Sequence, residues 1–204
     1  DGVVIVSPDA ETRSAYLKLE REFVVLRDEL ADNRDQPAKT SDGVVLELLA
    51  NINSASDTET ATGMGATGVG LFRTEYMYLT HPTVPDEDEQ LENYKRIIDA
   101  SPSSSITIRT LDIGGDKTVP YLGHSNQEAN PFLGWRSIRL SFEHPEFFST
   151  QIRAVLRAAY YARQSGSTVR LLFPMITTLD ECHRIRQIVR KAQRRLAKEK
   201  KEYA

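Results

Sequence analysis

The chain has 204 residues, 40% of them hydrophobic and 27% charged, a composition typical of a globular protein with a core of its own. Its formal net charge of -3 gives no general positive field, which argues against nucleic acid as a partner. No apolar run approaches the roughly 20 residues needed to cross a bilayer, so no membrane partner is expected. The single cysteine, Cys182, cannot form an internal disulfide, which favours a cytoplasmic location.

The N-terminal part is expected to form a short strand and then one long helix. The apolar run Val3–Val6 predicts a buried strand, and a chain that opens on it at Asp1 instead of Met suggests a piece of a longer protein. Ser7 and Pro8 are typical of a helix start, with Ser7 as the N-cap. The helix carries one narrow apolar stripe, typical of packing against a single partner: Tyr16, Leu19, Phe23, Leu26 and Leu30.

Beyond a linker around Pro37, apolar strands alternate with helices, which predicts a parallel sheet. The predicted strands are Val44–Ala50, Val69–Phe72, Ile106–Ile108 and Val169–Met175. The predicted helices are Asp86–Ala100, then Pro145–Gln164 ended by Gly166, and a last helix that begins with a capping box of Thr178 and Glu181.

This pattern predicts an α/β fold built from four strand–helix units. An eight-stranded barrel takes about 250 residues, more than residues 37–204 provide. We therefore predict a partial TIM (β/α)8 barrel, its first half with parallel strands, preceded by a long linker helix. Such barrels bind ligands at the carboxyl ends of their strands. Half a barrel also leaves its fourth strand with an unpaired edge, so we expect self-association or shielding by the last helix.

Two of the predicted strands end in an arginine followed by a threonine. Arg73 ends the strand at 69–72, and Arg109 ends the strand at 106–108. A guanidinium group can bind phosphate or carboxylate through two parallel hydrogen bonds, and it keeps its charge. A surface ion pair explains either arginine alone equally well, but the two together favour a site for a small anion. We expect both side chains on one side of the sheet, converging on one pocket.

The residues after Arg109 extend this candidate site. The pair Gly114-Gly115 is interpreted as backbone that approaches or covers a ligand, with a simple turn as the alternative. The nearby carboxylates either bind a metal or hold the arginines in place, and the spacing of Arg109 and Asp112 favours the second interpretation; these carboxylates are Glu75, Asp112 and Asp116.

The segment 130–136 combines a turn former, two aromatic residues and an arginine. We predict that Trp135 packs beneath this loop as a hydrophobic plug and that Arg136 lies over the site. Cys182 is expected to be a small core residue of the last helix. The four histidines share no metal-ligand spacing and are interpreted as surface residues: His81, His124, His144 and His183.

Four motifs together resemble enzyme I of the bacterial sugar phosphotransferase system, the phosphoenolpyruvate-protein phosphotransferase family. They are Gly-Val-Gly-Leu-Phe-Arg-Thr-Glu at 68–75, Arg-Thr-Leu-Asp-Ile-Gly-Gly-Asp-Lys at 109–117, Asn-Pro-Phe-Leu-Gly-Trp-Arg at 130–136 and Phe-Pro-Met at 173–175. Their order and approximate spacing match the family from near residue 1 to the end. The resemblance implies a cytoplasmic transferase of the kinase type. Such an enzyme moves the phosphoryl group of phosphoenolpyruvate to its own histidine and then to the carrier protein HPr, for sugar uptake.

The resemblance also implies roles for single residues. Arg73 and Arg109 would bind phosphoenolpyruvate, and Asp112, Lys117 and Arg136 would line or support the same pocket. Mg²⁺ is the implied cofactor and a homodimer the implied assembly. The family's phosphorylated histidine, its Mg²⁺ ligands, a further substrate arginine and its catalytic cysteine have no counterpart here. We therefore expect no catalytic residue and no metal ligand in this chain, and no activity of the chain alone.

By the same resemblance, residues 1–8 end the phosphohistidine domain, residues 9–36 form the helical linker, and residues 37–204 form the N-terminal half of the phosphoenolpyruvate-binding barrel. Two alternatives stay open at this point. One is a non-catalytic half-barrel that serves as a binding or interaction module. The other is a relative of pyruvate phosphate dikinase or phosphoenolpyruvate synthase, although the Ile-Gly-Gly-Asp-Lys run favours enzyme I.

Overall fold

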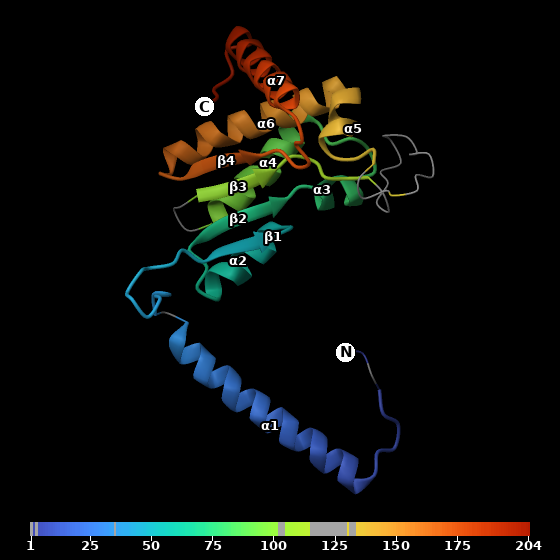
Figure 1. The fold of residues 1–204 in the computed structure, drawn as a ribbon, viewed down its shortest axis with the longest axis vertical. Coiled ribbons are helices and arrows are strands. Elements are labelled where there is room, and N and C mark those ends of the chain that lie inside the picture. Colours follow the sequence, from blue (N-terminus) through green and yellow to red (C-terminus); the bar gives the residue numbers. More distant parts are fainter. Residues whose placement is uncertain (1, 3, 35, 102–104, 115–129, 131–133) are drawn as a thin grey trace. The chain divides into compact units, whose positions relative to one another are not determined.

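The computed structural model describes residues 2, 4–34, 36–101, 105–114, 130 and 134–204 (Figure 1). The chain divides into two compact units, residues 1–46 and 47–204. Its helices and strands, in chain order, are α1 (Ala10–Asn33), β1 (Leu49–Ile52), α2 (Ala55–Gly63), β2 (Gly68–Arg73), α3 (Glu75–Thr80), α4 (Glu87–Ala100), β3 (Ser105–Arg109), α5 (Ile138–Glu143), α6 (Pro145–Gln164), β4 (Thr168–Leu172) and α7 (Leu179–Lys198). Among the described residues, no helix is both long and apolar enough to cross a membrane.

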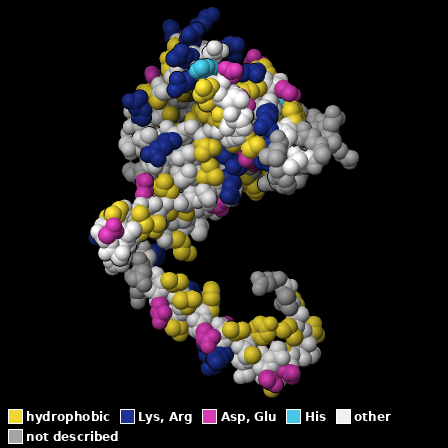
Figure 2. Space-filling model, in the orientation of Figure 1, with side chains coloured by type: hydrophobic (Ala, Val, Ile, Leu, Met, Phe, Trp, Pro, Cys, Tyr) yellow, Lys and Arg dark blue, Asp and Glu magenta, His cyan; other side chains and the backbone are white. Residues whose placement is uncertain are grey.

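Helix α1 is the main element of the first unit. Its N-cap is Asp9 rather than the predicted Ser7, because the Asp9 carboxylate accepts a hydrogen bond of 2.7 Å from the amide of Thr12. The predicted N-terminal strand is also wrong for the described residues 4–6, which pair with no other segment and expose Val4 and Val6. The apolar stripe of α1 is exposed, as the yellow side chains along this helix in Figure 2 show; it consists of Tyr16, Leu19, Phe23, Leu26 and Leu30. Whether residues 9–36 act as an interdomain linker stays a prediction.

The apolar residues after Gly43 pair locally instead of entering the sheet. The amide of Thr40 donates to the carbonyl of Val44 at 2.9 Å, and residues 39 and 45 form an antiparallel bridge. Gly43, in the turn of this small hairpin, has φ +89, which glycine adopts readily. The pair Asp42-Gly43 is also a strong turn signal. The strand predicted from Val44 is therefore wrong at its start, and β1 begins at Leu49.

The second unit contains an open four-stranded sheet with the order β1-β2-β3-β4, in which every pair is parallel. Sequential parallel strands connected through helices are the arrangement of an α/β barrel. Here the sheet does not close, and among the described strands β4 pairs only with β3. The predicted fold class, an α/β chain with part of a parallel barrel, is confirmed.

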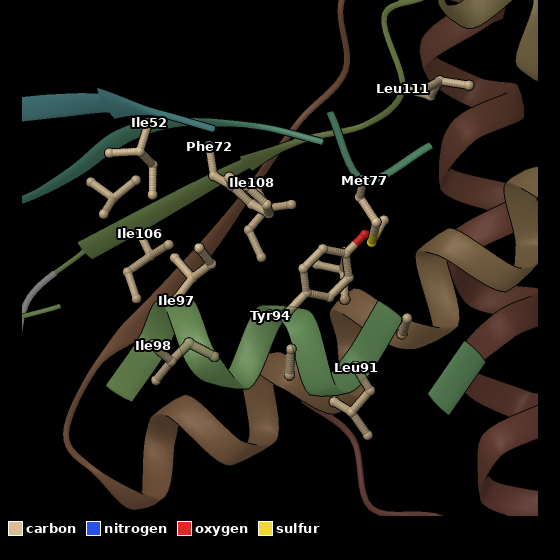
Figure 3. Close-up of a cluster of buried hydrophobic side chains, with 14 of the residues drawn as sticks. Ile52, Phe72, Met77, Leu91, Tyr94, Ile97, Ile98, Ile106, Ile108 and Leu111 are labelled. Carbon is tan, nitrogen blue, oxygen red and sulfur yellow. The ribbon is translucent and has the colours of Figure 1, made fainter. Parts of the chain in front are cut away.

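The main hydrophobic core lies between this sheet and helices α4 and α6. In β3 the buried residues alternate with half-buried ones, so Ile106 and Ile108 face the helices. Figure 3 shows these two side chains and Phe72 pointing toward Tyr94 and Ile97 of α4. Each large side chain buried in this way stabilises the fold by roughly 1.5–3 kcal/mol. The core thus fixes the strands whose ends carry the arginines.

Most predicted helices are confirmed. Their caps join residues only a few positions apart, so the sequence alone is enough to predict these helices. Helix α6 has its predicted bounds, and the predicted capping box of α7 forms. Helix α4 begins at Glu87, one residue later than predicted, because Asp86 is its N-cap, in a capping box that was not predicted. Strand β4 ends at Leu172, earlier than predicted, because a proline follows and Met175 has φ 63. Helices α2, α3 and α5 were not predicted because they are short and α2 has no large apolar side chain. The assignment of Cys182 to the core is corrected, because its side chain is only half-buried. The residue lies in the first turn of α7.

A cluster of charges joins α4, α6 and the segment after α7. The Glu87 carboxylate, with 15% of its side chain exposed, accepts hydrogen bonds from Arg157 at 2.6 Å, from Lys201 at 3.0 Å and from Arg153. Arg153 also donates to both carboxylate oxygens of Glu199, at 3.0 and 2.6 Å. Burial raises the pKa of Glu87, but the hydrogen bonds from the three cations outweigh it, and the pKa lies below its usual value.

We predict that Glu87→Gln lowers the free energy of unfolding by about 1–3 kcal/mol at pH 7, because three cations lose a charged acceptor. A carboxyl group with a depressed folded pKa stabilises the fold above its unfolded pKa, and this contribution is lost as pH falls through the folded pKa. The difference between the parent chain and the variant should therefore shrink below about pH 4.5. Urea unfolding at several pH values measures it.

The matched control is Glu92→Gln in the same helix, where the carboxylate is 60% exposed and, among the described residues, forms an ion pair only with Lys95. This variant should change stability by less than about 0.5 kcal/mol. Equal losses in the two variants would show that the Glu87 cluster has no special role.

The free edge of β4 predicts self-association of the chain. An edge strand presents unpaired backbone groups, and lysine on such a strand opposes pairing with another chain. Sedimentation velocity of the parent chain should show concentration-dependent dimers. The double change Thr168→Lys and Leu172→Lys, at two exposed β4 positions, should reduce them. Thr67→Lys, in the loop before β2, is the control. A parent chain that stays monomeric at all concentrations would contradict this expectation.

Candidate anion-binding site at the strand ends

The two arginines lie side by side at the carboxyl edge of the sheet. Arg73 is the last residue of β2, Arg109 is the last residue of β3, and the two are partners in the parallel register. Paired residues of neighbouring parallel strands, about 4.8 Å apart, point to the same face of the sheet. The expected common orientation is therefore confirmed, while a shared pocket stays a prediction.

Arg109 is held by two carboxylates. One terminal nitrogen donates to Glu75 Oε1 at 2.8 Å, and the other lies 3.1 Å from Asp112 Oδ2. The Nε of Arg109 is buried and has no hydrogen-bond partner among the described residues. Arg73, in contrast, is exposed, and it forms no ion pair with any residue that the structure describes. The site therefore pairs one oriented guanidinium with one exposed to solvent.

Asp112 links this pair to the third arginine. Its Oδ1 accepts hydrogen bonds from the guanidinium of Arg136, the shorter of 2.9 Å, and from the hydroxyl of Ser137. Burial raises the pKa of Asp112. These hydrogen bonds and the charges of Arg109 and Arg136 lower it by more, so the pKa lies below its usual value. Asp112 is thus a carboxylate at neutral pH, and it orients both arginines, as predicted for Arg109.

A close backbone crossing brings Arg136 to this position. Gly114 and Arg136 form an antiparallel bridge, and the amide of Ser137 donates to the carbonyl of Ile113 at 3.0 Å. Gly114 has φ +143, and a Cβ there would lie 2.2 Å from the Cβ of Arg136. Ser137 has φ 52 and ψ -121, a costly conformation that its contacts with Asp112 and Ile113 hold in place. Trp135 packs against the main core, while its predicted place beneath the loop stays a prediction because residues 131–133 lie outside the described residues.

Several predicted features lie outside the described residues: Gly115, Asp116, Lys117, His124 and residues 131–133 of the 130–136 loop. Their roles stay predictions. The described residues contain no group of three or more His, Cys, Asp or Glu side chains that could hold a metal ion. Glu75 and Asp112 instead serve the arginines, which agrees with the favoured interpretation of these carboxylates. His81 and His144 take part in local contacts with Thr83 and Trp135, and His183 is exposed.

Three residues near the site have no role in the sequence-based predictions: Thr74, noted there only as the neighbour of Arg73, Ser137 and Gln151. Thr74 and Gln151 are fully buried and hydrogen-bonded to each other, although they are far apart in the sequence. A signal for Gln151 was present, since it is an amide on the apolar face of α6 next to the buried Ile152. Ser137 gave no sequence signal.

We predict that Gly114→Ala destabilises the chain by about 1–3 kcal/mol, because φ +143 and the crossing at Arg136 both exclude a Cβ. The control is Gly63→Ala, where a Cβ meets nothing within 4 Å, and this change should be neutral or stabilising by up to about 1 kcal/mol. Thermal unfolding of both variants measures the difference. A Gly114→Ala variant as stable as the parent would contradict the described crossing.

Comparison with known proteins agrees with this geometry. Residues 27–204 match the family model described as "PEP-utilising enzyme, PEP-binding domain". The chain is 41% identical over 189 residues to the phosphoenolpyruvate-protein phosphotransferase of Listeria innocua, covering 93% of this chain and 32% of that protein. It is 39% identical over 198 residues to the protein of the same name from Bacillus subtilis, covering 97% of this chain and 34% of that protein.

The protein of that name from Geobacillus stearothermophilus is 40% identical over 189 residues. The chain thus spans about a third of the length of the curated relatives that it matches. Its three arginines, the carboxylates that orient Arg109 and Arg136, and the family match over most of its length lead to one conclusion. The chain belongs to the family of PEP-utilising enzymes, and its residues 27–204 match their PEP-binding domain.

Proposed function

We propose that this chain is the section of a phosphoenolpyruvate-protein phosphotransferase in which Arg73 and Arg109 bind phosphoenolpyruvate. The observation that carries the proposal is the register pairing of the two arginines at the carboxyl edge of the sheet. Phosphoenolpyruvate presents a phosphate and a carboxylate on a three-carbon frame, and each group is a good partner for a guanidinium. The names of the relatives support the same substrate.

The proposed roles follow from the contacts. Glu75 and Asp112 fix the plane of the Arg109 guanidinium, so this group is oriented before the substrate arrives. Arg73, which has no described carboxylate partner, is free to turn toward the second anionic group. Arg136 shares Asp112 with Arg109 and would add a third positive charge beside the substrate. Lys117 is proposed as a further support of the pocket.

Phosphoryl transfer mainly requires positioning and stabilisation of charge. In the proposed reaction the bond between phosphorus and the enol oxygen breaks as a bond from a histidine nitrogen to phosphorus forms, and enolpyruvate leaves. Negative charge on the transferring group and on the leaving oxygen is what the arginines offset. The acceptor histidine is proposed to belong to another part of the whole protein, so the chain alone should transfer no phosphate.

Further parts of this proposal rest on the family resemblance. They are HPr as the next acceptor, sugar uptake as the purpose, a homodimer as the assembly, Mg²⁺ as the cofactor and the cytoplasm as the location. Mg²⁺ would supply charge neutralisation at the phosphate. The described carboxylates near the arginines do not fit this ion, because Glu75 and Asp112 are already bound to guanidinium groups. Its ligands are proposed to lie in the rest of the protein.

We expect the chain to bind phosphoenolpyruvate with a dissociation constant near 1 mM or weaker. Two charge-assisted contacts contribute roughly 1.5–3 kcal/mol each before the entropic cost of binding, and 1 mM already requires about 4.1 kcal/mol. Titration followed by NMR should show this weak binding, unchanged by Mg²⁺. Arg73→Gln should weaken it by about tenfold or more.

The control for this titration is Arg96→Gln, which changes an exposed arginine of α4 and should leave the binding unchanged. Equal affinities of the Arg73 and Arg96 variants would contradict the proposed site. Micromolar, Mg²⁺-dependent binding, or stable phosphate on any histidine of the chain, would contradict the assignment of the metal and the acceptor to other parts of the protein.

A further inference from the structure

Gln151 is a fully buried amide in the middle of α6, with the buried Ile152 beside it. A buried amide is costly unless its oxygen and nitrogen both find partners. The Oε1 of Gln151 accepts a hydrogen bond of 3.0 Å from the amide of Leu111, and its Nε2 donates to the hydroxyl of Thr74 at 3.2 Å. Thr74 is itself fully buried, and its hydroxyl donates to the carbonyl of Arg109 at 2.9 Å.

These three hydrogen bonds can run in only one direction. The amide of Leu111 can only donate, so the oxygen of Gln151 must face it and the nitrogen must face Thr74. The Thr74 hydroxyl has a single proton, and the carbonyl of Arg109 can only accept it. We call these three hydrogen bonds, from Leu111 to Gln151, from Gln151 to Thr74 and from Thr74 to the carbonyl of Arg109, the relay. The relay requires an acceptor and a donor in one side chain at position 151, and a hydroxyl at position 74.

The relay acts on the backbone next to both arginines. Thr74 directly follows Arg73, and the carbonyl that Thr74 binds belongs to Arg109. Leu111, two residues after Arg109, is bound to the same glutamine. Gln151 thereby ties the ends of β2 and β3 to each other and to α6, a 20-residue helix packed on the core. Neither Thr74 nor Gln151 is exposed, so neither is placed to touch a ligand itself.

We propose that Gln151 and Thr74 are positioning residues that set the spacing of the Arg73 and Arg109 guanidinium groups for a ligand with two anionic groups. This inference rests on the proposed function, since it names the residues that prepare the phosphoenolpyruvate site. Small displacements of groups that orient a substrate weaken their effect strongly. Loss of the relay should therefore reduce ligand affinity even where the fold survives.

The first test uses Thr74, with phosphoenolpyruvate as the probe. Thr74→Val keeps the shape of the side chain but removes the hydroxyl, and it should weaken binding by about tenfold or more. Thr74→Ser keeps the hydroxyl and should bind within about threefold of the parent chain. Ile152→Ala removes packing from the same region of α6 without touching the relay. It should lower the melting temperature yet keep the parent affinity.

The second test uses pH. Gln151→Glu places a carboxylate that can only accept, so the Thr74 proton turns toward it and leaves the carbonyl of Arg109. Burial is expected to raise the pKa of the new carboxyl group. Binding should weaken as the pH rises through this pKa and recover as the pH is lowered and the protonated group donates to Thr74 again. The parent chain and Thr74→Val should show no such recovery.

The outcomes separate the two proposals. A parent chain that binds no phosphoenolpyruvate overturns the proposed function and, with it, this inference. A parent chain that binds while Thr74→Val binds equally well overturns the inference alone. The inference also fails if Ile152→Ala loses as much affinity as Thr74→Val, because the loss would then reflect stability and not position.

Discussion

Two guanidinium groups at the ends of neighbouring parallel strands repel each other, and the residues around the sheet edge are arranged to offset this repulsion. Glu75 and Asp112 supply the opposite charge, and both bind Arg109 and not Arg73. One arginine is thus enclosed and oriented, while its neighbour stays exposed to solvent. A small dianion or trianion that bridges the two would remove what repulsion remains. Ligand binding and local stability should therefore favour the same arrangement of the strand ends.

The rigidity of this edge comes from two kinds of contact. The apolar core holds β2 and β3 from the helix side through residues such as Phe72 and Ile108 (Figure 3). Beyond the last core residues, buried polar groups hold the strand ends. The hydroxyl of Thr74 and the side-chain amide of Gln151 form hydrogen bonds with backbone groups. Buried polar networks fix geometry more precisely than apolar packing because each bond has a preferred direction. This precision would suit the proposed substrate, because phosphoryl transfer depends mainly on position.

Much of the fold could be predicted from the sequence, because the deciding signals are local. The capping box of α7 and the whole of α6 follow from caps and periodicity within a few residues. The adjacency of the two arginines also follows, since equivalent ends of parallel strands meet at one edge. The strand predicted at 44–50 failed because a local hairpin competes for the same valines. Gln151 could not be assigned because its partners lie 40 and 77 residues away in the sequence.

The charge cluster at Glu87 has a consequence for how the chain folds and unfolds. Its bond to Lys201 joins residues 114 positions apart, so it closes one of the longest loops in the second unit. The entropy lost on closing such a loop must be offset before the contact stabilises the fold. Contacts between residues this far apart therefore tend to form late in folding. An interaction absent from the transition state slows unfolding and leaves the folding rate almost unchanged. The last residues of the chain, held there beside α4 and α6, thus act mainly on the lifetime of the folded domain.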